Sequence, residues 1–199
     1  FGQGNYRQID DTPYGGGGGM VLMAEPLFAA LDHAIANIGA STNLRIIYPS
    51  PQGLQWSQDA AQENSSLENL IFICGHYKDI DHRVIDKYVT HEYSIGDYVV
   101  TSGEIPTMIM IDSIVRLLPG VLNNFDSAKT DSFFSESLLD APYYTKPKKI
   151  DGLSVPEVLM SGNHEKIAAW REDERIRRTE VKRPDLAHAR AKKLESLEN

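Results

Sequence analysis

Residues 94–106 read Ser94-Ile-Gly-Asp-Tyr-Val-Val-Thr-Ser-Gly-Glu-Ile-Pro106. A β-rich run, Tyr98–Thr101, breaks into Ser102-Gly103, and Pro106 then opens an apolar helical pattern. A proline near a helix start loses no hydrogen bond, and a glycine lets a ligand touch the main chain. A strand, a small-residue turn and a helix in this order predict a cleft in which backbone groups read a flat ligand. Many α/β loops have a similar sequence, so the stretch alone does not identify the ligand.

The neighbouring sequence indicates an α/β domain. Two short apolar runs, Arg45–Tyr48 and Leu70–Cys74, are each followed by turn residues, as expected for buried strands. Two further segments, Leu27–Asn37 and Met108–Leu118, have helical spacing, and Pro119-Gly120 ends the second.

The second half of the chain has a different character. Residues 123–145 are mostly polar and predict a linker or mobile segment. From Val155 onward the pattern is helical, with Ser161 or Asn163 as the candidate N-cap. We therefore expect two domains, residues 1–122 and residues 146–199, joined by the segment 123–145.

Composition limits the class of protein. The chain has 199 residues, is 41% hydrophobic and contains one cysteine, which excludes an internal disulfide and fits a reducing compartment. It lacks an apolar run of the length that a membrane span needs, so we expect a cytoplasmic protein. The net charge of −8 does not favour RNA binding. Residues 164–199 nevertheless carry 10 basic and eight acidic residues, which fits either a solvated helix or an RNA contact surface.

Short motifs follow one another along the chain in a specific order. They are Asp10-Asp11-Thr-Pro13-Tyr14, Gly15–Gly19 with Met20, Tyr48-Pro49-Ser50-Pro51-Gln52-Gly53, Cys74-Gly75-His76-Tyr77, Ile80-Asp81 with Arg83, Ile95-Gly96-Asp97-Tyr98, Gly103-Glu104, Pro119-Gly120-Val121-Leu122, Asp131-Ser132-Phe133, Tyr144-Thr145 and Ser161-Gly162-Asn163-His164. This ordered set resembles the bacterial tRNA (guanine-N1)-methyltransferases, the TrmD family of the SPOUT superfamily. The resemblance covers residues 1–186, and the family's pattern begins with an earlier strand and helix that precede the first motif found here.

The resemblance implies a fold and an activity. The fold is α/β, with a SPOUT-type, mostly parallel sheet tied in a deep trefoil knot and followed by a small helical C-terminal domain. The activity is transfer of a methyl group from S-adenosylmethionine to N1 of the guanine on the 3′ side of the tRNA anticodon, by a homodimer with composite active sites. Alternatives are a non-catalytic RNA- or nucleotide-binding dimer, or another SPOUT RNA methyltransferase.

The resemblance also implies which residues bind the methyl donor. By motif these are Tyr48, Ser50, Pro51, Gly75, Tyr77, Ile95, Gly96, Tyr98, Val100, Gly103 and Pro106. Backbone N–H and C=O groups in such loops can read the adenine edges while apolar residues cover its faces. For Tyr48 and Tyr98, packing at the end of a strand is the alternative interpretation.

Two residues resemble the catalytic pair of the family. The target nitrogen of guanine carries a proton, which a carboxylate can remove as general base, and a fixed cation can stabilise the negative charge that develops on the base. Asp131 resembles this general base and Arg116 its cationic partner. Without the motifs, Asp131 fits a helix cap and Arg116 an ion pair with Asp112 four residues earlier.

The remaining candidates concern tRNA and magnesium. By resemblance His76, Asp140, Asn163 and His164 contact the substrate, although Asn163 and His164 fit a helix cap equally well. Basic residues of the tail are candidate phosphate contacts: Arg171, Arg175, Arg178, Lys182 and Arg183. Magnesium assists the family's reaction, but the sequence predicts no metal-binding residues.

Three positions depart from the family. Lys78 stands where glutamate is usual, near the methionine end of the donor, and its charge opposes that of the donor's amino group unless it turns to solvent. The neighbouring Asp79 could substitute for the glutamate. Ser102 replaces a usual glycine, and Lys146 a common arginine that would contact phosphate in a bidentate manner. Lys78, Ser102 and the absence of the family's earlier strand and helix are the basis of the non-catalytic alternative.

Overall fold

A computed structural model of the chain describes residues 1–39, 43–123, 128–134 and 137–197. The chain divides into two compact units, residues 1–122 (unit 1) and residues 123–199 (unit 2). The segment 123–145, which the sequence predicts as a linker, is grouped with unit 2. The predicted mobility of this segment falls partly on residues 124–127 and 135–136, which lie outside the described residues.

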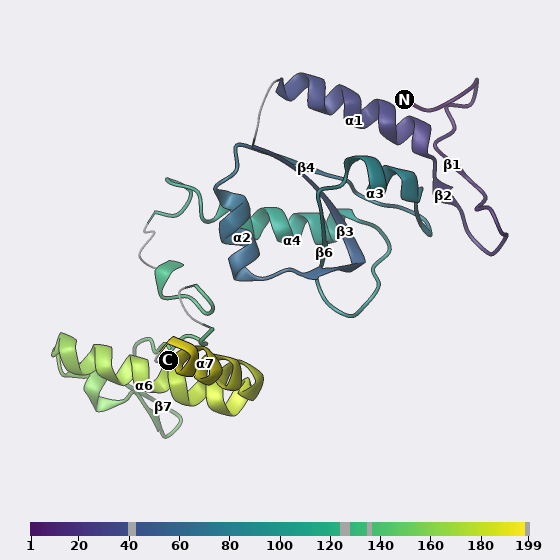
Figure 1. The fold of residues 1–199 in the computed structure, drawn as a ribbon. Helices are drawn as coiled ribbons and strands as arrows, with labels where there is room; N and C mark the ends of the chain where they lie inside the picture. Colours follow the sequence, from purple (N-terminus) through teal and green to yellow (C-terminus); the bar gives the residue numbers. More distant parts are fainter. Residues whose placement is uncertain (40–42, 124–127, 135–136, 198–199) are drawn as a thin grey trace. The chain divides into compact units, whose positions relative to one another are not determined.

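Unit 1 alternates strands and helices along the chain (Figure 1). Its elements are β1 (Asp10–Asp11), β2 (Val21–Leu22), α1 (Ala24–Ile38), β3 (Leu44–Gln55), α2 (Gln58–Ser65), β4 (Asn69–Phe72), β5 (Asp79–Ile80), α3 (His82–Tyr88), β6 (His91–Ser94) and α4 (Glu104–Val115). The central sheet has the order β4-β3-β6 with both pairs parallel. A smaller sheet has the order β1-β2-β5. The predicted α/β class with a mostly parallel sheet is confirmed.

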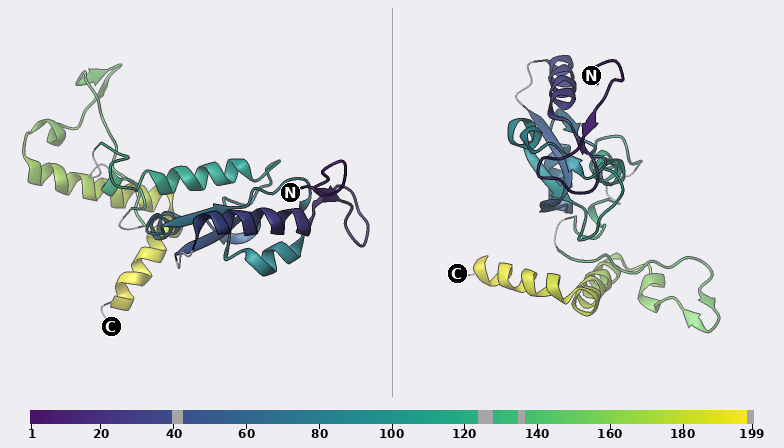
Figure 2. Two further views of the ribbon diagram at one scale, coloured as in Figure 1. Left: turned by 90° about the horizontal axis from the view of Figure 1, so that it is seen from above. Right: turned by 90° about the vertical axis from the view of Figure 1, so that its right-hand side faces the viewer.

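Helices cover both faces of the central sheet. Successive side chains of a strand point to opposite faces, and in β3 Ile46 and Tyr48 pack in one apolar cluster with residues of α1 and α3. Ile47, between them, packs in a second cluster with Met110 of α4 and Ala60 of α2. Figure 2 shows α3 and α4 on opposite sides of the sheet. This two-sided burial explains why Ile46, Ile47 and Tyr48 are consecutive apolar residues within β3.

Around α4 the sequence predicted a helix correctly, but the helix begins earlier than Met108 and ends at Val115, before the predicted stop at Pro119-Gly120. The strand predicted before it is absent. Pro106 lies in the first turn of α4, where its missing N–H costs no hydrogen bond. The predicted β-rich run Tyr98–Thr101 is wrong, because β6 ends at Ser94 and residues 95–102 form a loop. The Ser94 hydroxyl accepts a hydrogen bond from the Gly96 N–H, and Gly96 has φ +142°, so the chain turns away from the sheet.

Unit 2 is mainly helical. Its described elements are β7 (Lys149–Ile150), β8 (Leu153–Ser154), the 3₁₀ helix η1 (Glu157–Met160), α6 (His164–Lys182) and α7 (Pro184–Leu197). Thr179 of α6 is buried, and its hydroxyl accepts a hydrogen bond from the Leu139 N–H and donates one to the Arg175 carbonyl. This contact fastens the segment before β7 to α6. The helical pattern predicted from Val155 onward is confirmed.

Candidate functional site

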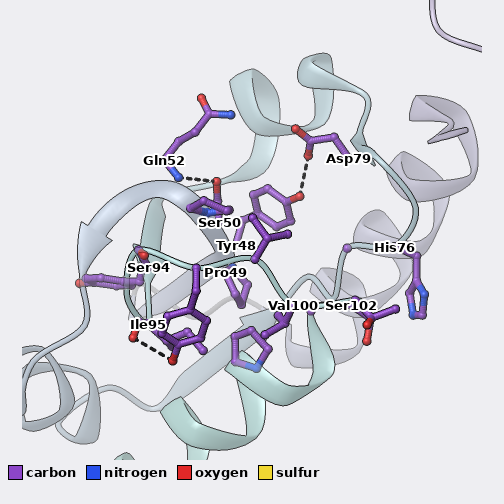
Figure 3. A pocket seen from close by; sticks show the side chains of 18 of the residues that line it. Tyr48, Pro49, Ser50, Gln52, His76, Asp79, Ser94, Ile95, Val100 and Ser102 are labelled. Carbon is purple, nitrogen blue, oxygen red and sulfur yellow. Dashed lines mark hydrogen bonds between the residues drawn. The ribbon is translucent and has the colours of Figure 1, made fainter. Parts of the chain in front are cut away.

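A pocket of about 390 Å³ opens at the carboxyl-terminal side of the central sheet (Figure 3). Its walls come from residues 48–52 of β3, from residues 75–79 after β4, and from the segment 93–103 at the end of β6 and beyond, with Pro106 of α4. Parallel strands all direct their carboxyl ends to one edge of a sheet, and this edge is where α/β proteins bind ligands. The pocket is of the size that small-molecule sites have.

Two glycines bring the walls into direct contact. The Gly103 N–H donates a hydrogen bond to the Gly75 carbonyl at 2.8 Å. A Cβ atom on Gly103 would lie 2.6 Å from the Gly75 nitrogen and 2.8 Å from the Cys74 Cα. A Cβ atom on Gly75 would lie 2.9 Å from the Tyr48 hydroxyl oxygen. The sequence needs glycine at both positions because side chains there would push apart the loops that form the pocket.

Tyr48 and Asp79 form a polar contact in the pocket wall (Figure 3). The Tyr48 hydroxyl donates a hydrogen bond to Asp79 Oδ1 at 2.7 Å, and the Ile80 N–H donates to the same oxygen at 2.7 Å. Burial of Tyr48 and, secondly, the nearby Asp79 carboxylate raise the pKa of the Tyr48 hydroxyl far above its ordinary value. Tyr48 therefore stays protonated and remains a donor at every pH that the fold tolerates.

The segment after β6 forms the wall opposite Asp79. Ser94 is buried and exchanges hydrogen bonds with the backbone of Gly96. The Tyr98 ring is packed so closely over Gly96 that a Cβ there would lie 2.6 Å from the ring. The Tyr98 hydroxyl donates to the Ile95 carbonyl at 3.3 Å. Turn geometry and the aromatic ring together shape a wall of backbone groups and uncharged side chains.

A close contact between two side chains lies beside the pocket, and one of them, His76, also lines it. His76 Nε2 lies 2.6 Å from Glu104 Oε1 at the start of α4. Hydrogen bonding from the Ser102 side chain, and then from His76, lowers the pKa of the Glu104 carboxyl to about 2. The pair connects the loop after β4 with the beginning of α4 across 28 residues of sequence.

The predicted donor-binding residues all lie in one place. All eleven of them, from Tyr48 to Pro106, line this pocket. His76 and the departing residues Lys78 and Ser102 line it as well. Gln52 and Ser94 also line it and were not predicted. Their position near the carboxyl end of a strand is the signal that could have found them.

The other predicted residues lie elsewhere. Arg116 is the C-cap residue of α4 and is not among the described lining residues. Asp131 lies in unit 2, where its N–H donates to the Ala128 carbonyl. Asp140 accepts hydrogen bonds from the Ala141 N–H and the Tyr143 hydroxyl. The pocket belongs to unit 1 and the candidate base to unit 2.

The start of α6 resolves one sequence alternative. The Asn163 side-chain oxygen accepts a hydrogen bond from the Lys166 N–H at 3.0 Å, so Asn163 is the N-cap, and His164 is the first helical residue and is exposed. The capping prediction for Asn163 is confirmed, whereas Ser161 precedes the cap. The Asn163 amide N–H₂ remains outside this capping contact.

The described residues contain neither a cluster of metal-ligating side chains nor a membrane-spanning helix. Among residues 1–39, 43–123, 128–134 and 137–197, no cluster of three or more His, Cys, Asp or Glu side chains could hold a metal ion. In the same part of the chain, no helix has the length and apolar character needed to cross a bilayer.

Comparisons with known proteins match most of the chain to one family. The sequence model of the family described as tRNA (Guanine-1)-methyltransferase TrmD matches residues 1–189. A tRNA (guanine-N(1)-)-methyltransferase of Staphylococcus carnosus is 52% identical over 181 residues, which are 91% of this chain and 72% of that protein. Proteins of the same name are 52% identical in Lacticaseibacillus paracasei (91% of this chain, 69% of that protein) and 48% identical in Clostridioides difficile (94% and 80%).

Proposed function

The chain belongs to the tRNA (guanine-1)-methyltransferase family, as its ordered motifs predict, and from this we propose its reaction. The protein transfers a methyl group from S-adenosylmethionine to N1 of the guanine on the 3′ side of the tRNA anticodon. The observation that carries the proposal is the pocket in unit 1, which gathers all eleven residues that match the family's donor-binding motifs.

The pocket fits the methyl donor in size and chemistry. Its volume of about 390 Å³ lies within the range of small-molecule sites. Gly96 and Gly103 line the pocket without a side chain, so their main chain borders the space that a ligand would fill. When bound, S-adenosylmethionine supplies an electrophilic methyl group on its sulfonium sulfur. Ile95 and Val100 supply apolar surface in the same wall.

Asp131 and Arg116 perform the proton chemistry in this proposal. The Asp131 carboxylate accepts the N1 proton of guanine as the bond from N1 to the methyl carbon forms and the bond from sulfur to that carbon breaks. The Arg116 guanidinium stabilises the negative charge that develops on the guanine carbonyl oxygen. For Arg116→Ala we expect a loss of turnover similar to that of Asp131→Asn, with donor binding retained.

The tRNA contacts are assigned to the rim of the pocket and to unit 2. His76, Asp140, Asn163 and His164 are the proposed contacts, and the amide N–H₂ of Asn163 takes no part in its capping bond. The basic residues of α6 are proposed to contact phosphates, which position the substrate without reading its sequence. In this scheme residues 146–199 bind tRNA, residues 123–145 connect the domains, and the protein acts in the cytoplasm, where its substrate is.

Two architectural features complete the proposal. The pocket loops form a deep trefoil knot, and the close approach of Gly103 to Gly75 and Cys74 supports such a tight passage of the chain. The protein is a homodimer in which the donor pocket of one subunit meets Asp131 of the other, which gives two identical composite sites. No step in this scheme is routed through magnesium.

A second candidate is a non-catalytic RNA- or nucleotide-binding dimer. Lys78 favours it, because a lysine in the pocket opposes a cationic donor unless another group offsets its charge. Transfer of radiolabel from [methyl-³H]S-adenosylmethionine to an unmodified tRNA transcript separates the two. We expect labelled 1-methylguanosine after digestion to nucleosides, and none when the target guanine is replaced by adenine. Label in a ribose 2′-O-methyl group would indicate another SPOUT methyltransferase, and no label would favour the binding protein.

A further inference from the structure

The hairpin β7–β8 of unit 2 is specified by its turn and not by burial. Its strands pair antiparallel, with Ile150 opposite Leu153. Asp151 and Gly152 connect them with φ +50° and +82°, the positive values that a type I′ turn requires and that Asp-Gly favours. Every residue of both strands is exposed, and Figure 2 shows the hairpin extending away from α6. The hairpin is therefore available for a contact outside its own chain.

The hairpin segment, residues 146–154, carries an excess of positive charge. Its basic residues are Lys146, Lys148 and Lys149, and Asp151 is its only acidic residue. All four side chains are exposed. Among the described residues, none of the three lysines has an ion-pair partner. Their charges are therefore not offset by a carboxylate in contact with them.

The arginines of the neighbouring helices differ in this respect. Arg175 and Arg177 each pair with the glutamate three residues earlier, at 3.0 and 2.6 Å. Arg183 pairs with Asp185 at 2.7 Å. A paired arginine has to give up its carboxylate, or share it, before it contacts a phosphate group. The hairpin lysines do not have this cost, so they attract an anion more strongly than their number suggests.

Both faces of the hairpin carry a lysine. Successive side chains of a strand point to opposite faces, so Lys149 lies on one face and Ile150 on the other. The Val155 N–H donates to the Lys148 carbonyl at 3.0 Å, which continues the pairing of the two segments to Lys148 and places it on the face of Ile150. That face also holds Leu153, and Ile150 and Leu153 are 54% and 79% exposed. A lysine beside exposed apolar side chains matches a nucleotide, which presents a phosphate group next to a less polar ribose.

We propose that the hairpin β7–β8 contacts the backbone of the tRNA and that Lys148 and Lys149 pair with its phosphate groups. Contacts of this kind position a nucleic acid without reading its sequence. The inference rests on the proposed function, because it takes tRNA as the ligand, and it adds two phosphate contacts that the family motifs do not include.

An anionic membrane surface is the other ligand with this chemistry. A lysine close to such a surface contributes about 1 kcal/mol, and stable membrane anchoring usually needs a larger apolar insertion than two side chains. RNA is favoured because the chain belongs to a family that acts on tRNA. Binding to vesicles is therefore included in the test as the competing outcome.

The salt dependence of tRNA binding by the full chain tests the inference. Fluorescence anisotropy with an unmodified tRNA transcript gives the association constant between about 50 and 200 mM KCl, a range in which each phosphate contact contributes roughly 0.7–0.9 to the slope of its logarithm against the logarithm of the salt concentration. Lys148→Gln and Lys149→Gln should each reduce the slope by roughly this amount and weaken binding roughly 3- to 10-fold at the lowest salt. The double variant should lose roughly twice as much slope.

Three further variants separate a local contact from a change in net charge. The double variant Lys148→Arg with Lys149→Arg keeps both charges and should keep the wild-type slope. Lys192→Gln removes one charge from an exposed residue of α7 and should change neither slope nor affinity. Asp151→Asn should bind tRNA about two- to threefold more tightly, because it removes the acidic residue of the hairpin and Asn-Gly also suits a type I′ turn.

A second RNA and a vesicle complete the design. A tRNA with adenine in place of the target guanine should lose affinity by the same factor in each lysine variant, because phosphate contacts do not read the base. A loss confined to the original tRNA would overturn the inference. Vesicles of phosphatidylglycerol and phosphatidylcholine should not bind the wild type. Vesicle binding that disappears in the Lys148→Gln, Lys149→Gln chain, with tRNA affinity unchanged, would assign the hairpin to a membrane surface instead.

The remaining outcomes distinguish this inference from the proposed function. If the wild type methylates tRNA and the double glutamine variant keeps its slope and affinity, only the inference fails. It also fails if Lys192→Gln lowers the slope as much as Lys148→Gln does, since the effect is then one of net charge. If the wild type binds tRNA with the expected change in the lysine variants but transfers no methyl group, the proposed function fails and the hairpin contact stands.

Discussion

Unit 1 and unit 2 differ in how completely each builds a site by itself. Unit 1 buries apolar side chains on both faces of a parallel sheet. The loops at the carboxyl ends of its strands together line one pocket. In unit 2 the described buried residues are Ala128, Leu138, Ala141 and Thr179, and its candidate residues are spread over a loop and a helix start. We infer that donor binding is a property of unit 1, whereas the proton chemistry needs unit 2 as well.

Asp131→Asn should have the largest effect, because it should lower turnover and leave donor binding by unit 1 nearly unchanged. A general base is worth about 100- to 10,000-fold in rate, so turnover should fall by that factor, while donor affinity, a property of unit 1, should stay nearly unchanged. Single-turnover methylation and calorimetry with the donor measure both quantities. Near-normal turnover in the variant would mean that Asp131 is not the base.

Gly103→Ala should lower donor affinity, which is the quantity that Asp131→Asn leaves nearly unchanged. The added Cβ would lie 2.6 Å from the Gly75 nitrogen, which belongs to the backbone and cannot swing away. Overpacking of this kind costs about 1–3 kcal/mol, which we expect to appear as a roughly 10- to 100-fold loss of donor affinity. The matched control is Gly18→Ala, where a Cβ has no neighbour within 4 Å. Equal donor affinity in the two variants would contradict the contact between the pocket loops.

Tyr48→Phe should have a smaller effect, again confined to unit 1. It removes the hydroxyl that donates to Asp79 Oδ1, while the Ile80 N–H still binds the same oxygen. We expect a loss of about 1–2 kcal/mol in the free energy of unfolding, measured by urea denaturation. Tyr98→Phe is the comparison, since its exposed hydroxyl makes only the longer bond to Ile95. A larger loss of unfolding free energy in Tyr98→Phe than in Tyr48→Phe would show that burial does not decide how much each hydroxyl contributes to stability.

The smallest effect is expected from pH at the rim of the pocket. The pKa of Glu104 is lowered from 4.5 to about 2, so the ionised form is favoured by the fold. Its contribution to stability is therefore complete above pH 4.5 and is lost as the pH falls towards 2. Glu104→Gln should slightly flatten the pH dependence of the thermal midpoint of unfolding in this window, whereas Glu180→Gln, an exposed change in α6, should not. If the pH dependence of the thermal midpoint is the same in Glu104→Gln as in the wild type, ionisation of Glu104 does not contribute to stability in this pH range.

Periodicity predicted the elements whose burial is regular. Ile46 and Ile47 mark β3 because both faces of its sheet are covered, and Pro106 marks the first turn of α4. The run Tyr98–Thr101 has the composition of a strand but has no partner strand among the described residues, because Ser94 and Gly96 turn the chain out of the sheet. Composition carries no information about the partner of a strand, so this error could not be avoided from the sequence.

The candidate site was predicted by motif resemblance rather than by spacing. Tyr48, Gly75 and Gly103 are far apart in sequence, and only the meeting of parallel strand ends places them in one pocket. The pairing of His76 with Glu104 depends on that same convergence across 28 residues. It could not be read from either motif alone, because nothing in their sequences specifies the distance between the two loops.

Subunit mixing tests most directly whether the pocket of unit 1 and Asp131 of unit 2 are separable parts of one composite site. An Asp131→Asn chain is mixed with a Gly103→Trp chain, whose donor pocket is blocked, and subunit exchange is verified before methyl transfer is measured. Each variant alone should be inactive. In the proposed dimer, roughly half of the randomly paired dimers are mixed, and each mixed dimer has one intact site, so about a quarter of all sites should regain activity. No recovery after verified exchange would show that base and pocket come from the same subunit, which would contradict the composite site.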